Sequence, residues 1–99
     1  MKTIISNINK SFENRVRLGV MSLLIVNDWV DFNEFKEALN VTNGNLASHI
    51  TALEKEKYVQ IRKAFIGKKP HTSFQATVEG KQAFQEHLNA LEALIKGSL

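Results

Sequence analysis

Residues 42–53 of this 99-residue chain read TNGNLASHITAL, a pattern typical of a helix with an unusually small outer face. Thr42 can cap the start of the helix, because its hydroxyl can accept a hydrogen bond from a free backbone N–H group. At about 100° per residue, three apolar side chains share one narrow arc and are expected to be buried. They are Leu46, Ile50 and Leu53. The opposite face carries Gly44, Ser48, Thr51 and Lys55, with Asn45 and Ala52 beside them. Long charged side chains are usual on a solvated face, so this composition favours close contact with another molecule.

A second, shorter helix is predicted just before Thr42. Asn33 can cap it, and the helix would run over Glu34–Leu39. Asn40 follows, and asparagine is one of the few residues that tolerates the left-handed conformation of a helix end. Because only two residues lie between Leu39 and Thr42, the pattern predicts two helices joined by a tight turn.

Two more helical patterns precede this pair. Apolar residues at helical spacing predict a terminal helix over residues 1–12, and they are Ile4, Ile5, Ile8 and Phe12. Ser11 is expected to cap the next helix, Phe12–Val26, which Asn27 would end. Residues 29–32 can then form no more than a small strand.

A β-hairpin is predicted after the central helix pair. Val59–Ile66 and His71–Ala76 favour strands, and residues 67–70 (Gly-Lys-Lys-Pro) favour the turn between them. Alternation predicts a core-facing set made of Val59, Ile61, Phe65 and Phe74. The same alternation predicts an outward-facing set made of Gln60, Arg62, Ser73 and Gln75.

Thr77 is expected to cap a last helix, Val78–Lys96, which Gly97 ends. Its apolar face spans well over 100°, more than a terminal helix of one small domain requires. Packing this face and the first helix against a second copy would bury both, so a homodimer is expected. The predicted dimer-interface residues are Ile4, Ile5, Ile8, Phe84, Leu88, Leu91 and Ile95. The alternative is a monomer in which the terminal helices at residues 1–12 and 78–97 fold back on the domain.

The distribution of charge is more informative than the net charge of +3. Residues 57–76 hold five Lys and Arg residues and no acidic residue, so this segment carries +5. The remainder of the chain therefore sums to −2, which is 3 minus 5. A basic hairpin on a mildly acidic body predicts an anionic partner at a defined place, although a merely solvated hairpin would have the same charge.

Length and composition exclude several classes of protein. The chain is long enough for one domain over residues 1–99, and zero cysteine excludes disulfides and thiolate metal sites. The longest apolar stretch, Val20–Val26, is far shorter than a membrane span, and no signal-peptide core is present, so a cytoplasmic location is expected. No phosphate-binding glycine loop, metal-ligand cluster or nucleophile grouping is evident. We therefore expect neither an enzyme nor a cofactor.

The predicted order is that of a mainly α winged helix-turn-helix with a small β-hairpin wing and terminal dimerisation helices. The chain resembles small single-domain transcriptional regulators of the multiple-antibiotic-resistance-regulator (MarR) type over about residues 14–95. The matching segments are Arg17-Leu18, Phe32–Phe35, Thr42–His49, Leu53-Glu54, Tyr58-Val59, Phe65–Pro70 with Thr72, and Thr77, Gly80 and Phe84. The family usually has glycine where this chain has Lys57, and a larger aliphatic residue where it has Ala76.

The resemblance implies a double-stranded DNA partner, and the residue chemistry suggests how it is bound. The predicted helix-side contacts are Thr42, Asn43, Gly44, Asn45, Ser48, His49 and Ala52. The first three would offer backbone N–H groups to a phosphate, and Asn45, Ser48 and His49 would face base edges in the major groove. The predicted wing contacts are Arg62, Lys63, Lys68, Lys69 and His71, on phosphates or in the adjacent minor groove.

Other interpretations stay open at this point. His49 lies at the edge of the buried stripe, so it could cap the core instead of touching DNA. A winged helix can also serve as a protein–protein interaction module without DNA binding. Any small-molecule effector is unknown, and it would have to bind at the dimer interface or between helices.

Overall fold

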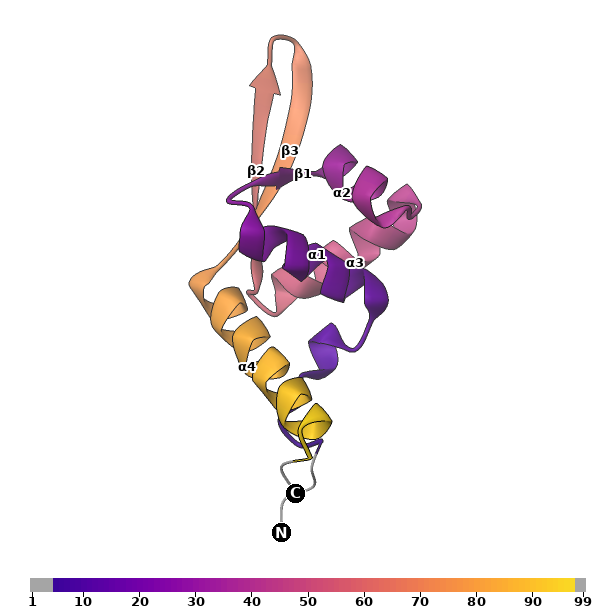
Figure 1. The fold of residues 1–99 in the computed structure, drawn as a ribbon. Helices are drawn as coiled ribbons and strands as arrows, with labels where there is room; N and C mark the ends of the chain where they lie inside the picture. The colour runs from indigo at the N-terminus through magenta and orange to yellow at the C-terminus, as the bar shows by residue number, and fades with distance from the viewer. Residues whose placement is uncertain (1–4, 98–99) are drawn as a thin grey trace.

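The computed structural model describes residues 5–97, whose helices and strands pack around one hydrophobic core. Figure 1 shows their arrangement. A 3-10 turn, η1, covers Lys10–Phe12. The elements that follow are α1 (Arg15–Val26), β1 (Val30–Asp31), α2 (Phe32–Leu39), α3 (Asn43–Lys55), β2 (Val59–Ile66), β3 (Lys69–Ala76) and α4 (Val78–Ile95). This is the predicted winged helix-turn-helix order of helices, strand and hairpin.

Side-chain caps define where the helices begin. Thr42 caps α3 and Thr77 caps α4, as predicted. The predicted caps of the two earlier helices are wrong. Asn14, not Ser11, caps α1, because its side-chain oxygen accepts from the backbone of the first turn. Asp31, not Asn33, caps α2, because Asp31 and Glu34 have the spacing of a reciprocal capping box.

The predicted turn between α2 and α3 is confirmed. Asn40 has φ 52, the left-handed conformation expected at the end of α2. The stripe of Leu46, Ile50 and Leu53 on α3 is buried, as predicted. These residues join a core with members from every helix and strand, and its largest fully buried side chains are Phe12, Phe35, Met21, Leu24, Leu46, Leu53 and Val20.

The sheet has three antiparallel strands in the order β1-β3-β2. Strand β1 covers β3 only at Phe74 and Ser73, whereas β2 pairs with β3 without a break from Val59 to Ile66. The loop between β2 and β3 is tighter than predicted: only Gly67 and Lys68 form it, and Gly67 has φ 65. A two-residue hairpin with glycine at its first position favours this positive φ.

The hairpin projects beyond the helices, and this corrects part of the predicted alternation (Figure 1). Val59 and Phe74 are buried as predicted, but Ile61 and Phe65 are exposed. Phe65 pairs with the exposed Pro70 in the projecting part of the hairpin, whereas Ile61 lies opposite the buried Phe74 but on the edge strand β2. Ser73 was predicted to face outward and is buried, because it lies on the central strand opposite Asp31 and Arg62.

The two ends of the chain differ in how well they match expectation. Residues 5–9 form turns and a bend, so the predicted helix over residues 1–12 is wrong for its described part; Ile4 lies outside the described residues. Helix α4 begins at Val78 as predicted and ends at Ile95, one residue before the predicted end, and Gly97 follows with φ 66. An added Cβ at Gly80 would overlap the backbone carbonyl of Tyr58, so glycine is what allows α4 to approach the start of β2 this closely.

Candidate nucleic-acid interface

The start of α3 presents a small, exposed polar surface. The hydroxyl of Thr42 accepts a hydrogen bond from the backbone N–H of Asn45 at 3.2 Å, which holds the first turn. All the side chains predicted for DNA contact in this turn are exposed, namely Thr42, Asn43, Asn45 and Ser48. The space around Gly44 is open to at least 4 Å. This surface can be approached closely, and it leaves free N–H groups near the helix start.

His49 has a different environment from its neighbours on α3. It is half-buried, and its Nδ1 accepts a hydrogen bond from Nε of Arg17 on α1 at 2.9 Å. Burial lowers the pKa of His49, and the positive charge of Arg17 lowers it further. His49 therefore links α3 to α1 as a neutral acceptor. Ala52, also predicted as a contact, is half-buried as well.

Arg17 is a residue whose place at this surface the sequence did not reveal. It lies 32 residues from His49 and carries a permanent charge to the flank of α3. The only sequence signal was its place in the Arg17-Leu18 pair that opens the first core helix, because no local spacing connects α1 with α3.

The wing carries exposed cations that have no acidic partner within residues 5–97. Lys63, Lys68 and Lys69 are all exposed on the projecting hairpin. Within residues 5–97, the two salt bridges are His71–Asp31 and Lys96–Glu92, so these lysines take part in neither. An unpaired cation that remains hydrated is available to an external anion.

Arg62 stacks on an aromatic ring at the base of the wing. Its guanidinium carbon lies 4.0 Å from the ring centroid of Trp29, in a cation–π arrangement. Beside it, Gln60 donates to Gln75 at 2.6 Å, and Gln75 donates to Asp28 at 2.5 Å. These contacts tie the hairpin to the loop before β1 and set the direction in which the wing projects. Trp29 itself is half-buried under Arg62.

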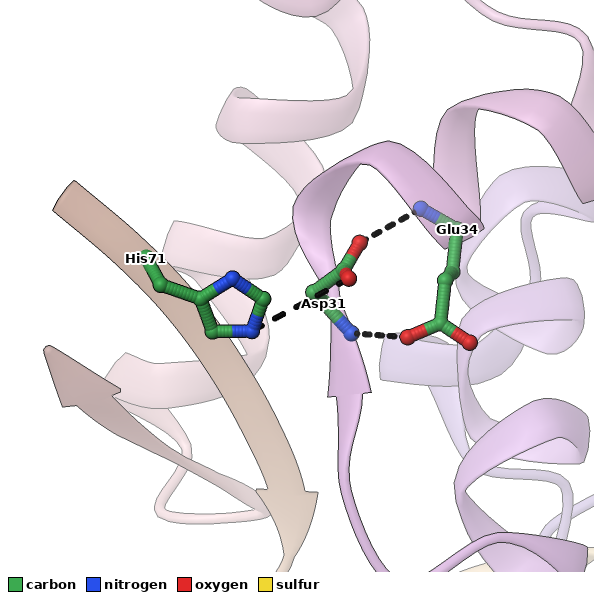
Figure 2. Close-up of polar contacts among 3 residues, drawn as sticks. All are labelled: Asp31, Glu34 and His71. Carbon is green, nitrogen blue, oxygen red and sulfur yellow. Dashed lines mark hydrogen bonds and ion pairs between the residues drawn. The ribbon is translucent and has the colours of Figure 1, made fainter. Parts of the chain in front are cut away.

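The side chain of His71, a predicted DNA contact, points toward Asp31 on the body of the domain (Figure 2). Its Nε2 lies 3.9 Å from Oδ2 of Asp31, whose other oxygen accepts from the backbone N–H of Glu34 at 2.7 Å. The Glu34 carboxylate completes the capping box by accepting from the backbone N–H of Asp31 at 3.1 Å. An open cleft of about 400 Å³ lies here between α2, α3 and the hairpin.

Part of the predicted dimer face of α4 is already buried in the core of the single chain. Phe84 is buried, and His87 beside it is only 2% exposed. Leu88 (40% exposed) and Ile95 (85% exposed) remain on the surface, and Leu91 is half-buried. At the other end of the chain, Ile5 is exposed and Ile8 is half-buried.

His49, His71 and His87 lie on three different elements. Over residues 5–97, no three histidine or carboxylate side chains are grouped closely enough to hold a metal ion. The helices in the same part of the chain are each too short or too polar to cross a membrane.

Comparison with known proteins places this arrangement among winged helices. Residues 16–95 match the family described as winged helix DNA-binding domain. An uncharacterised protein of Methanocaldococcus jannaschii is 33% identical over 87 residues, which cover 88% of this chain and 95% of that protein.

Two solved structures show the same fold. A transcriptional regulator homologue from Pyrococcus horikoshii is 34% identical, with a TM-score of 0.81 over 95% of this chain and 91% of its own. A regulator described as a member of the MarR family, from Enterococcus faecalis, has a TM-score of 0.66 at 22% identity, over 97% of this chain and 87% of its own. The predicted likeness to MarR-type regulators is thus confirmed at the level of the fold.

Proposed function

The chain belongs to the family of winged helix DNA-binding domains, and from this premise we propose that it is a dimeric, sequence-specific transcriptional regulator. The observation that carries the proposal is the pairing of two surfaces. One is the exposed polar start of α3, and the other is the unpaired cationic wing. A polar helix surface suits base edges, whereas a cationic hairpin suits phosphates.

In this proposal, α3 enters the major groove. Asn45 and Ser48 hydrogen-bond to base edges, and the backbone N–H groups at Thr42, Asn43 and Gly44 bind a phosphate. Lys63, Lys68 and Lys69 bind phosphates on the flank, and Arg62 reaches the backbone from its stack on Trp29. His49 acts through its bond to Arg17 by holding the helix against α1. His71 orients the hairpin beside Asp31.

The dimer rests on the apolar side chains that one chain leaves uncovered. Leu88 and Ile95 are exposed on α4, and Ile5 is exposed nearby in the chain's first turn. A second copy packed on α4 would cover them and bring two α3 helices to one face. Such a dimer would address two half-sites about 34 Å apart on the duplex.

The salt dependence of duplex binding tests the DNA partner. Removing one cation that binds a phosphate reduces the slope of log K against log salt by about 0.9. We expect Lys68→Ala combined with Lys69→Ala to flatten the slope by about two units in a fluorescence-anisotropy titration. The matched control, Lys10→Ala with Lys81→Ala, removes two exposed lysines away from the wing and should leave the slope unchanged. An absence of duplex binding even at low salt would favour a protein-binding module instead.

Sequence preference tests the assignment of α3. Sites are first selected by the wild-type chain from a random duplex pool. Asn45→Ala and Ser48→Ala should then reduce the affinity ratio between selected and unselected duplexes. Where a bidentate pair of hydrogen bonds to a base is removed, the difference in binding free energy between the two duplexes should fall by about 1–3 kcal/mol. The control, Asn89→Ala on α4, should keep the ratio. If both α3 variants weaken all duplexes equally, these side chains contact the backbone and not the bases.

A further inference from the structure

The tip of the wing exposes two large apolar side chains that the fold does not cover. Phe65 is 74% exposed and Ile66 is 66% exposed, immediately before the loop at Gly67. All the other aromatic side chains of the chain lie in the described residues, and each is buried or half-buried. Phe65 is thus the one aromatic ring left mostly in water.

The position of Phe65 in the hairpin explains why its ring finds no core. Its cross-strand partner is Pro70, which is itself exposed, and the buried part of β3 begins only at Ser73 and Phe74. Phe65 therefore contributes nothing to the hydrophobic core of the domain. A polar residue would suit a solvated tip better. An apolar tip on an otherwise polar hairpin is the pattern of a surface that enters a partner.

The charges around the tip indicate the chemistry of that partner. Lys63 lies two residues before Phe65 on β2, Lys68 lies in the loop, and Lys69 is the cross-strand partner of Ile66. None of the three is in a salt bridge within residues 5–97. Apolar side chains ringed by cations complement an anionic polymer with an apolar interior. Duplex DNA has this character, because stacked base faces lie between two rows of phosphates. A minor groove about 6 Å wide admits side chains at a hairpin tip but not the hairpin itself.

Resting on the proposed function, we infer that Phe65 is an apolar wedge that enters the minor groove beside the α3 site and bends the duplex. The ring inserts partly between two base pairs, Ile66 lines the groove wall, and the lysines hold the flanking phosphates. Wedges of this kind unstack one base step and kink DNA by about 20–90°. Pyrimidine–purine steps unstack most easily, so the wing would add sequence preference at a step that α3 does not touch.

The inference is tested with a duplex of about 40 base pairs, long enough to carry a selected site and both flanks. Energy transfer between dyes at its two ends measures bending, and 2-aminopurine at the flanking step measures unstacking. At saturating wild-type protein, we expect both signals to rise. Phe65→Ser should reduce both by at least about half, and Phe65→Leu should keep most of them because leucine is also an effective wedge. Lys68→Ala with Lys69→Ala should weaken binding yet restore both signals at saturation.

The salt slope separates a wedge from a merely structural role. Phe65→Ser removes no charge, so its slope should equal that of the wild type, and its circular dichroism should show an intact fold. Wild-type protein that binds the duplex without either signal would overturn the wedge and leave the proposed function standing. Wild-type protein that binds no duplex would overturn both.

A lipid surface is the other partner with anionic and apolar character. Vesicles of phosphatidylserine and phosphatidylcholine provide the comparison in a co-sedimentation assay. If Phe65→Ser abolishes vesicle binding while the DNA signals stay at the wild-type level, the tip is a membrane contact and the wedge is overturned. The wedge requires the reverse, namely loss of the DNA signals in Phe65→Ser and no vesicle binding by the wild type.

Discussion

Lys57 occupies a backbone position that suits glycine. It has φ 65 at the junction of α3 and β2, where its carbonyl accepts a hydrogen bond from the Thr77 hydroxyl at 2.6 Å. A left-handed conformation costs a residue with a Cβ about 1–2 kcal/mol. The bonds at this junction hold Lys57 in place, because they join the end of α3 to the start of α4.

We predict that Lys57→Gly stabilises the fold. Glycine removes the left-handed strain but adds about 0.4–1 kcal/mol of unfolded-state entropy, so the net gain in unfolding free energy should be about 0.5–1 kcal/mol. Urea titration followed by circular dichroism measures it. Lys55→Gly, in the last turn of α3, is the matched control and should destabilise by about 1 kcal/mol. An equal loss of unfolding free energy in Lys57→Gly and Lys55→Gly would contradict the prediction. It would show that the side chain of Lys57 stabilises the fold by more than its left-handed backbone conformation destabilises it.

At the scale of elements, His87 joins the N-terminal segment to α4. Its Nδ1 accepts from the backbone N–H of Asn9 at 3.0 Å, and the side chain of Asn9 donates to the Tyr58 hydroxyl at 3.2 Å. Phe12 packs its ring against His87 and Phe84, at centroid distances of 5.4 and 5.3 Å. The segment before α1 is therefore held by the hydrogen bonds of Asn9 to His87 and Tyr58 and by the aromatic cluster around Phe12.

This contact makes stability depend on pH. Burial lowers the pKa of His87, and the nearby Glu13 carboxylate opposes part of that effect. The unfolded chain takes up the proton near pH 6.5, whereas the folded chain takes it up at lower pH. The contribution of His87 is therefore complete above about pH 6.5 and is lost as pH falls through the folded pKa. Each unit by which the pKa is lowered corresponds to about 1.4 kcal/mol.

The measurement is the unfolding free energy of wild type and His87→Gln at about pH 7.5 and about pH 5, on either side of the ordinary histidine pKa. The amide oxygen of glutamine can accept from Asn9 but does not titrate. We expect the wild type to lose more stability than the variant over this interval. His49, whose pKa is also lowered, leaves the variant with a residual loss of the same sign. Identical pH profiles would contradict a role for His87 in the acid sensitivity.

Helices whose caps and apolar spacing agree could be predicted closely from the sequence. Thr42 and Thr77 each stand one residue before a helix with clear apolar spacing, and α3 and α4 begin where expected. The prediction of a helix over residues 1–12 was wrong for its described part, because apolar spacing alone does not provide a cap. Asn9 and Asn14 instead turn the chain twice in six residues.

Contacts between distant elements could not be predicted. The period-two pattern of β2 is the same whether the strand lies over a core or projects from it. The pattern alone therefore predicted that Phe65 faces the core, whereas it is exposed. The buried and exposed sides of α3 depended on local spacing and could be predicted, but the bond of His49 to Arg17 and the position of His71 on β3 beside Asp31 could not. Both contacts involve partners on other elements, far away along the chain, for which the sequence has no local signal.

At the scale of the whole molecule, the chain is elongated, with extents of 57 × 25 × 22 Å. The hairpin projects at one end and α4 runs toward the other (Figure 1). This separation places the C-terminal half of α4 far from the wing (Figure 1). It also allows a second copy to pack on α4 without covering either the start of α3 or the wing.

We predict that a single charge on α4 separates the dimer. Leu88→Glu would place a carboxylate in the apolar contact, where it has no counter-charge, and burying it there is strongly unfavourable. Sedimentation at micromolar concentration should change from twice 11.2 kDa for the wild type to 11.2 kDa for the variant. Ile95→Glu should act alike; its side chain is 85% exposed, so the change cannot unfold the single chain through lost packing. Gln82→Glu, on an exposed polar side of α4 turned away from Leu88, is the matched control and should remain dimeric. A wild type that sediments at 11.2 kDa would show that α4 does not pair, and the chain would then bind a single half-site.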